Sequence, residues 1–200
     1  MKVNEWSRGL LRTDRCLSAA GRWSAALGRR SDLRVWSSAL HKNLRHGTFM
    51  MDTTWVTGRI AVGGGIWTAE NMAHVARAGV THVLDMQIEF DDTSLAEPHG
   101  ITVLWNPIDD DFQPKPPDVF QRGVDFALEA LDEEGTKIFV HCAAGVHRAP
   151  MMTLAILCSL GWELADALRL IETRRPVVDF ADVYVNSVKG YLQQQVKAGK

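Results

Sequence analysis

The feature that most constrains the fold of this chain is an alternation of strand-like and helix-like patterns that begins near Asp52. Strand patterns occupy 55–64 (two strands around a glycine turn), 80–86, 101–108 and 136–142, and helix patterns occupy 69–78, 119–133, 150–160, 163–174 and 179–196. Asp118 is expected to cap the second of these helices. The alternation predicts an α/β fold with a mostly parallel sheet of about four to five strands, flanked by helices on both faces.

The chain divides into two parts of different charge. Through His46 it has ten Lys and Arg against three Asp and Glu, whereas the remainder has twelve against 21. We therefore expect residues 1–50 to be a basic, poorly ordered extension and residues 51–200 to be a folded domain. Arg8, Arg15, Arg22 and Arg29 are spaced by seven residues, as in an organellar transit peptide or a membrane-surface helix. A reading frame that truly starts at Met50 or Met51 is the alternative.

Composition excludes several classes of protein. Apolar residues make up 46% of the chain and charged residues 23%, as in a globular protein with a core. The longest uncharged apolar stretch, 149–162, has 14 residues, fewer than the ~20 that cross a bilayer. Three cysteines favour free thiols in a reducing compartment, and hence a cytoplasmic location. Organellar targeting by residues 1–50 stays open, and the basic extension alone does not indicate nucleic-acid binding.

The segment HCAAGVHRAP, residues 141–150, is the strongest candidate for chemistry. Cys142 follows a buried-type strand pattern, Gly145 lies in the middle of the loop, and Pro150 suits the first turn of the next helix. The spacing of cysteine and arginine is weak on its own, since Cys16 and Arg22 repeat it without the strand or the apolar helix. The context of Cys142 predicts a strand, a tight loop and a helix N-terminus.

Such a loop is an anion site. Successive backbone N–H groups converge on one point, and the helix dipole adds positive potential there. Because a helix N-terminus and a nearby guanidinium favour the ionised form of a thiol, we expect Cys142 to be a thiolate. Arg148 offers paired N–H donors that match two phosphate oxygens. Asp109, Asp110 and Asp111 follow the strand pattern at 101–108 and are candidates for a proton donor.

These residues resemble the cysteine-dependent phosphatases, and specifically the dual-specificity protein phosphatases of the protein-tyrosine-phosphatase superfamily. HCAAGVHR matches the HCxxGxxR signature at every fixed position, and GRIAVGGG, AGVTHVLDM, NPIDD and LRLIETRRP are similar to further family segments. The similarity extends from about Thr54 to Leu192. It implies that residues 51–200 form a catalytic domain of this kind.

The resemblance implies a metal-independent, cofactor-free mechanism with a cysteinyl-phosphate intermediate. Cys142 would be the nucleophile, Asp110 the general acid and base with Asp111 as the fallback, and Arg148 the group that binds phosphate and the transition state. His141 would be a buried histidine that supports the loop. The phosphate-binding loop would comprise Ala143, Ala144, Gly145, Val146, His147 and Arg148.

Two positions depart from the family pattern. Ala149 stands where relatives usually have Ser or Thr, whose hydroxyl helps the sulfur leave in the second step. His147 occupies a variable position, and we expect it to be a surface residue rather than a contact of the substrate. Cys158 is expected to be a core thiol and not a partner for oxidised Cys142.

The expected substrate is a phosphorylated protein, on phosphotyrosine and on phosphoserine or phosphothreonine. A phosphoglucan or phosphoinositide phosphatase of the same superfamily is an alternative, although the variable loop positions contain no lysine to favour a polyanionic head group. A phosphate-binding module with weak turnover and a rhodanese-like sulfurtransferase are more distant alternatives. The rhodanese loop is shorter by one residue and needs no acid loop.

Overall fold

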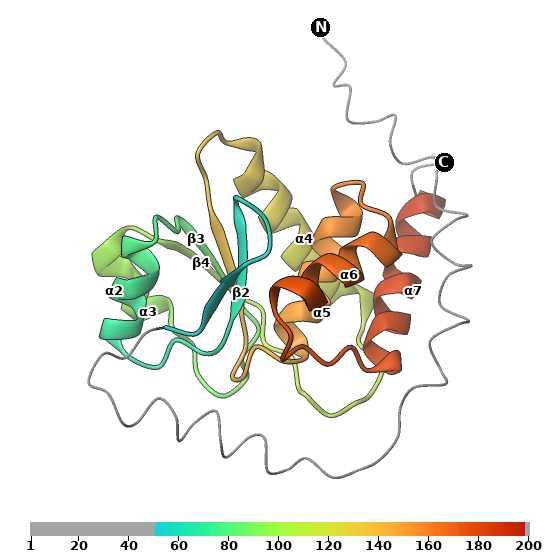
Figure 1. Cartoon of the computed structure of the whole chain (residues 1–200), viewed down its shortest axis with the longest axis horizontal. Coiled ribbons are helices and arrows are strands. Elements are labelled where there is room, and N and C mark those ends of the chain that lie inside the picture. The colour runs from blue at the N-terminus through green and yellow to red at the C-terminus, as the bar shows by residue number, and fades with distance from the viewer. Residues whose placement is uncertain (1–50, 199–200) are drawn as a thin grey trace, which may run out of the picture.

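The centre of the fold is a mostly parallel sheet. A computed structural model describes residues 51–198, in which five strands follow the order β1-β2-β5-β3-β4 (Figure 1). The strands are β1 (Thr53–Trp55), β2 (Ile60–Gly63), β3 (His82–Asp85), β4 (Thr102–Trp105) and β5 (Ile138–His141). Only the β1–β2 pair is antiparallel. The carboxyl ends of the four parallel strands therefore share one edge, where ligands of such sheets bind.

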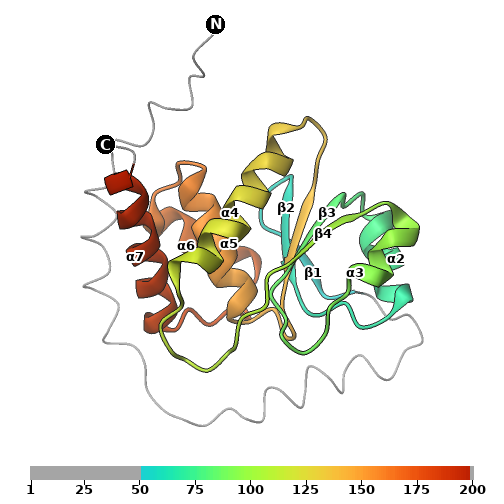
Figure 2. The same cartoon turned by 180° about the vertical axis from the view of Figure 1, so that it is seen from behind.

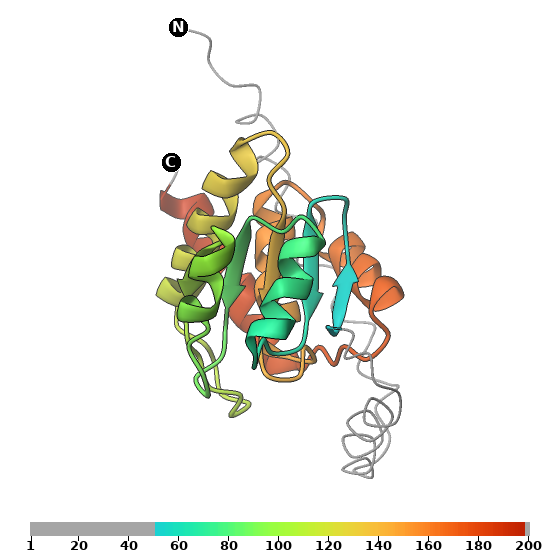
Figure 3. The same cartoon turned by 90° about the vertical axis from the view of Figure 1, so that its left-hand side faces the viewer.

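Helices cover both faces of this sheet. One side has α4 (Pro117–Asp132), α5 (Arg148–Ser159), α6 (Leu164–Arg174) and α7 (Asp182–Ala198). The other has α2 (Ala69–Arg77), α3 (Thr93–Ala96) and the 3₁₀ turn η4 (Glu97–His99). Figures 1 and 2 show the two helical layers on either side of the strands, and Figure 3 shows α2 in front of the sheet.

Strand β5 lies at the centre of the sheet and contributes to both cores. Ile138 and Val140 belong to the cluster that packs against α4, α5 and α7, whereas Phe139 belongs to the cluster beneath α2. Side chains of a strand alternate between its two faces, so a continuous apolar run such as IFV suits a strand covered on both sides. Helix α5 is buried from Arg148 to Leu157. The loop between β5 and α5 is therefore held at each end by a buried element.

The predicted architecture is confirmed, with differences at the element boundaries. The helix expected over 119–133 begins at Pro117, its N-cap is Pro116, and no side chain caps it. The prediction of an Asp118 cap was therefore wrong: two prolines open this helix, and Asp118 instead pairs with Arg122 at 2.6 Å. Sequence reasoning also missed α3 and η4. The expectations for residues 1–50 lie outside the described residues. Within 51–198, no helix is long and apolar enough to cross a membrane.

Candidate active site

The loop from Cys142 to Arg148 is held by hydrogen bonds to its carbonyl groups. Arg175 donates from Nε to the Gly145 carbonyl at 2.8 Å and from Nη2 to the Ala144 carbonyl at 3.4 Å. The backbone N–H of Gly65 donates to the Ala143 carbonyl, and that of Asp179 to the Val146 carbonyl, each at 3.1 Å. Four consecutive carbonyls are therefore bound by groups outside the loop.

This outward bonding sets the direction of the loop amides. No peptide bond among residues 51–198 is cis, and in a trans peptide the N–H points away from the C=O. The N–H groups that follow these four carbonyls, those of residues 144–147, consequently point to the opposite side. In the described part of the chain, none of them donates a backbone hydrogen bond. Together with the N-terminus of α5, they form a cradle suited to an anion.

Gly145 is required by this geometry. Its φ is +65°, a region that side chains other than glycine rarely adopt. A Cβ at this position would stand 2.5 Å from the carbonyl of Gly63 and 2.5 Å from Nη2 of Arg175. Gly145 is thus enclosed by β2 and by the arginine that holds the loop.

Cys142 lies at the base of the loop, directly after β5, and only 1% of its surface is exposed. Arg148 is also buried, with 3% exposed, at the first position of α5. Burial by itself would lower the pKa of Arg148, but hydrogen bonds to Glu89 and the charges of Cys142, Glu89 and Asp110 raise it. The guanidinium therefore stays charged beside the sulfur.

The orientation of Arg148 is fixed by a carboxylate and two carbonyls. Nη1 and Nη2 bind Glu89 at 3.0 and 2.8 Å, and Nη1 also donates to the carbonyl of Ile108 at 3.1 Å and, more weakly, to that of Met86 at 3.4 Å. These bonds lower the pKa of Glu89. Nε is buried and has no hydrogen-bond partner within residues 51–198. It remains available to a phosphate oxygen.

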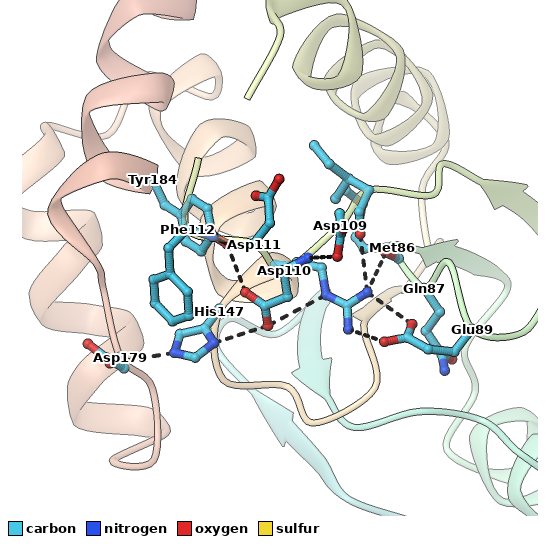
Figure 4. A network of polar contacts seen from close by, with 12 residues as sticks. Met86, Gln87, Glu89, Asp109, Asp110, Asp111, Phe112, His147, Asp179 and Tyr184 are labelled. Atoms are coloured by element: carbon cyan, nitrogen blue, oxygen red, sulfur yellow. Dashed lines mark hydrogen bonds and ion pairs between the residues drawn. The ribbon is translucent and has the colours of Figure 1, made fainter. Parts of the chain in front are cut away.

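Asp110 is the only one of the three predicted acids that contacts this constellation among the described residues. Its Oδ1 accepts a bond from the Tyr184 hydroxyl at 2.8 Å, and its Oδ2 lies 3.1 Å from Nδ1 of His147 and 3.7 Å from Nε of Arg148 (Figure 4). Burial alone would raise the pKa of Asp110, but the bonds to His147 and Tyr184 and the charges of His147 and Arg148 lower it.

The other two acids of the loop turn away. Asp109 accepts the backbone N–H of Asp110 at 2.7 Å, and Asp111 pairs with Lys115. Asp111 also accepts the N–H of Gln113 at 3.0 Å. The geometry therefore favours Asp110 over the fallback.

His147 is not the surface residue that the sequence led us to expect. It is 8% exposed, and its ring nitrogens face Asp110 at 3.1 Å and Asp179 at 3.5 Å (Figure 4). The ring of Phe112 packs edge-on against it at 5.1 Å and is stacked on Tyr184 at 5.7 Å. The prediction failed because both partners become neighbours only when the acid loop and the segment before α7 fold against the cysteine loop.

His141 is fully buried, as predicted, and belongs to a cluster beneath the loop. Its Nε2 lies 3.0 Å from Asp92 and 3.7 Å from Asp85, and all three side chains are inaccessible to solvent. Burial raises the pKa of Asp85 to about 7, although the charge of His141 opposes this. Within residues 51–198 this is the one group of three side chains whose spacing would suit a metal ion. Among the described residues, neither ring nitrogen of His141 and neither carboxylate oxygen of Asp92 has a hydrogen-bond partner, so these side chains are held by packing and by their short separation.

Three further residues of the site were missed from the sequence. Glu89 orients Arg148, Tyr184 binds Asp110, and Arg175 holds the loop while pairing with Asp52 at 2.6 Å. Only Arg175 carried a signal. It stands immediately before a proline, where a helix ends, and within LRLIETRRP, one of the segments that resemble the family.

A thiol at the base of an amide cradle, an arginine with one unpaired donor and a carboxylate beside it can together perform phosphoryl transfer to sulfur. On a parallel sheet flanked by helices, this combination defines the class of cysteine-dependent phosphatases.

Comparison with known proteins narrows the class. The family model of the dual specificity phosphatase catalytic domain matches residues 65–194. This chain therefore belongs to the dual specificity phosphatase family. The human dual specificity protein phosphatase 26 is 34% identical over 128 residues, which cover 63% of this chain and 57% of that protein. The rat dual specificity protein phosphatase 5 is 29% identical over 116 residues, 58% of this chain and 29% of that protein. The chain thus spans only part of the curated relatives it matches.

Solved structures show the same fold. PTPMT1 in complex with PI(5)P superimposes with a TM-score of 0.65 at 19% identity, over 74% of this chain and 97% of that one. Human DUSP28 superimposes with a TM-score of 0.61 at 20% identity, over 72% and 94%.

Proposed function

We propose that residues 51–200 form a catalytic domain that hydrolyses phosphomonoesters through a cysteinyl-phosphate intermediate, without a metal or cofactor. The supporting observation is the loop from Cys142 to Arg148, whose carbonyls are bound outward and whose amides are left for an anion. Charge in the transition state spreads over the equatorial phosphate oxygens. These amides and Nε of Arg148 would stabilise that charge.

In the first step, Cys142 attacks phosphorus while Asp110 gives a proton to the departing oxygen. In the second step, a water gives a proton to Asp110 and displaces the sulfur. Asp110 suits both roles because its Oδ2 lies beside Nε of Arg148, where the bound phosphate would sit. The five residues between Cys142 and Arg148 exceed the loop of a rhodanese, and family membership favours phosphate as the substrate group.

Phosphorylated protein is the substrate class that we infer, with phosphotyrosine and phosphoserine or phosphothreonine both accepted. Two curated relatives are named dual specificity protein phosphatases. The variable loop positions Ala143, Ala144, Val146 and His147 provide no lysine for a multiply charged head group. The PI(5)P complex of PTPMT1 makes a phosphoinositide the comparison to include. The free thiol of Cys142 fits a reducing compartment such as the cytoplasm.

The test is hydrolysis of p-nitrophenyl phosphate by the full chain in the presence of EDTA. We expect activity that Cys142→Ser abolishes and that Asp110→Asn lowers about 10²–10⁴-fold. Asp111→Asn is the matched control, because it removes a neighbouring carboxylate that does not contact Arg148 among the described residues. Turnover that EDTA abolishes, or that survives Cys142→Ser, contradicts the mechanism. A panel of phosphotyrosine peptide, phosphothreonine peptide, phosphoglucan and phosphoinositide tests the substrate class.

A further inference from the structure

The pair formed by His147 and Asp110 raises a question about where the catalytic proton resides. A general acid must carry its proton at the working pH, yet the contacts of Asp110 favour its ionised form. Oδ1 accepts from Tyr184, while Oδ2 faces His147 and Arg148. In the free enzyme the carboxyl is therefore a poor store for the proton that the leaving group needs.

His147 is placed to store that proton instead. Its Nδ1 faces Asp110 at 3.1 Å, and its Nε2 faces Asp179 at 3.5 Å. An imidazole between two carboxylates is stabilised in its charged form. Burial would lower the pKa of His147, but the bonds and charges of Asp110 and Asp179 raise it. Asp179 is 63% exposed, so water screens its share, and Asp110 is the dominant partner.

The surroundings of the pair support proton retention. The ring of Phe112 lies against His147 at 5.1 Å, which limits access of water from that side. The other titratable groups near His147 are Arg148, which follows it at the start of α5, and Tyr184 on α7, whose ring centroid lies 6.3 Å from that of His147. Burial raises the pKa of Tyr184, so its hydroxyl remains a donor to Asp110. Arg148 is positive, but Glu89 balances it through two bonds.

We propose that His147 holds the catalytic proton in the resting enzyme and exchanges it with Asp110 during turnover, so that the two side chains act as one acid–base unit. The proposal rests on the proposed function and adds to it a positioning residue that the family signature leaves variable. His147 acts on the reaction through Asp110.

The proton balance closes over one cycle. A phosphate dianion beside Arg148 disfavours the charge on Asp110, and the proton passes from Nδ1 of His147 to the carboxyl. The carboxyl gives it to the leaving oxygen as the S–P bond forms and the P–O bond breaks. A water then attacks phosphorus and gives one proton to Asp110, which returns it to His147. The S–P bond breaks, and the sulfur leaves with the electron pair as a thiolate.

His147→Asn tests this unit. An asparagine can place its side-chain N–H where Nδ1 lies and keep the bond to Asp110, but it cannot carry a proton. We expect the basic limb of the kcat profile to move to lower pH. At about pH 7.5, kcat for phenyl phosphate should fall at least about tenfold, within the range of general acid catalysis. The loss for p-nitrophenyl phosphate should be smaller, because its leaving group needs less protonation. Near pH 5 the variant should approach the wild type with both esters.

Two further variants distinguish the proton exchange between His147 and Asp110, called the relay below, from a general loss of activity. His99→Asn removes an exposed histidine far from the acid loop in the fold and should leave both profiles unchanged. Asp179→Asn should move the basic limb in the same direction as His147→Asn, by less. As a readout independent of turnover, ¹⁵N NMR of the His147 ring should show titration above that of an ordinary histidine, and Asp110→Asn should lower it.

The outcomes distinguish the two proposals. An unshifted basic limb in His147→Asn, or an equal loss at every pH and with both esters, overturns the relay and leaves the phosphatase assignment intact. A His147 titration that Asp110→Asn does not lower also overturns it. Absence of hydrolysis by the wild type overturns the proposed function and the relay together.

Discussion

Arg175→Met is the substitution that best tests whether the loop is held from outside. Methionine keeps much of the side-chain volume but removes the donors to the Gly145 and Ala144 carbonyls. The Gly145 residue is buried, so its carbonyl loses a partner that water cannot fully replace, at about 1–3 kcal/mol. Asp52, the ionic partner, is 49% exposed and becomes hydrated, so the lost ion pair adds little.

Arg175→Met should therefore lower the free energy of unfolding by about 1–3 kcal/mol. In a domain of this size, each kcal/mol corresponds to a decrease of about 2–4 °C in Tm. Activity should fall further than stability. If two loop amides lose their alignment with the phosphate, and a hydrogen bond to a charged group contributes about 1.5–3 kcal/mol, kcat/KM should fall by about 10²-fold or more.

The assays are urea unfolding and kcat/KM for p-nitrophenyl phosphate, with inhibition by inorganic phosphate as a separate measure of the cradle. Asp52→Asn is the matched control. It removes the charge that faces Arg175 and keeps an acceptor, and we expect less than about 1 kcal/mol and near-normal activity. If Arg175→Met binds phosphate as well as Asp52→Asn does, the loop holds its own shape and the argument from its carbonyls is wrong.

Four other changes have directions set by the structure. Gly145→Ala should abolish activity, because its Cβ would stand 2.5 Å from the Gly63 carbonyl at a φ of +65°; Gly190→Ala in α7 meets nothing within 4 Å and should stabilise by about 0.5–1 kcal/mol. Both are measured by urea unfolding and turnover, and equal effects would refute the contrast. Asp85 has a pKa raised to about 7 by burial, so its folded form prefers the proton and unfolding free energy should fall as pH rises from about 4 to about 7. Asp85→Asn, which keeps the Oδ1 acceptor for the Gln87 N–H, should flatten that slope in urea titrations; an unchanged slope assigns it to other groups. Ala149→Ser should supply the hydroxyl that the family pattern leads us to expect at this position and raise kcat where hydrolysis of the intermediate limits turnover; rapid-quench measurement of the phosphoenzyme should show less accumulation, and more accumulation would contradict this.

The sheet and the cysteine loop were predictable because their signals are local. A continuous apolar run such as 138–140 indicates a strand buried on both faces, and the Gly145 and Pro150 positions indicate a tight turn into a helix. The short helix Thr93–Ala96 was missed, since four residues with no side-chain cap hydrogen bond leave little pattern.

The supporting residues of the site were less predictable for a different reason. Glu89, Arg175 and Tyr184 act on the site through partners that are 59, 30 and 74 residues away in the sequence. A single sequence gives no periodicity that joins such positions. The environment of His147 was misjudged for the same reason, because its ring contacts Asp110 and Asp179, which are distant from it in the sequence.

Arg175, which directly follows α6, pairs with Asp52, which directly precedes β1. During synthesis on the ribosome, the cysteine loop emerges well before the arginine that clamps it. The carbonyls of Ala144 and Gly145 therefore gain this partner only once the chain has been made as far as Arg175.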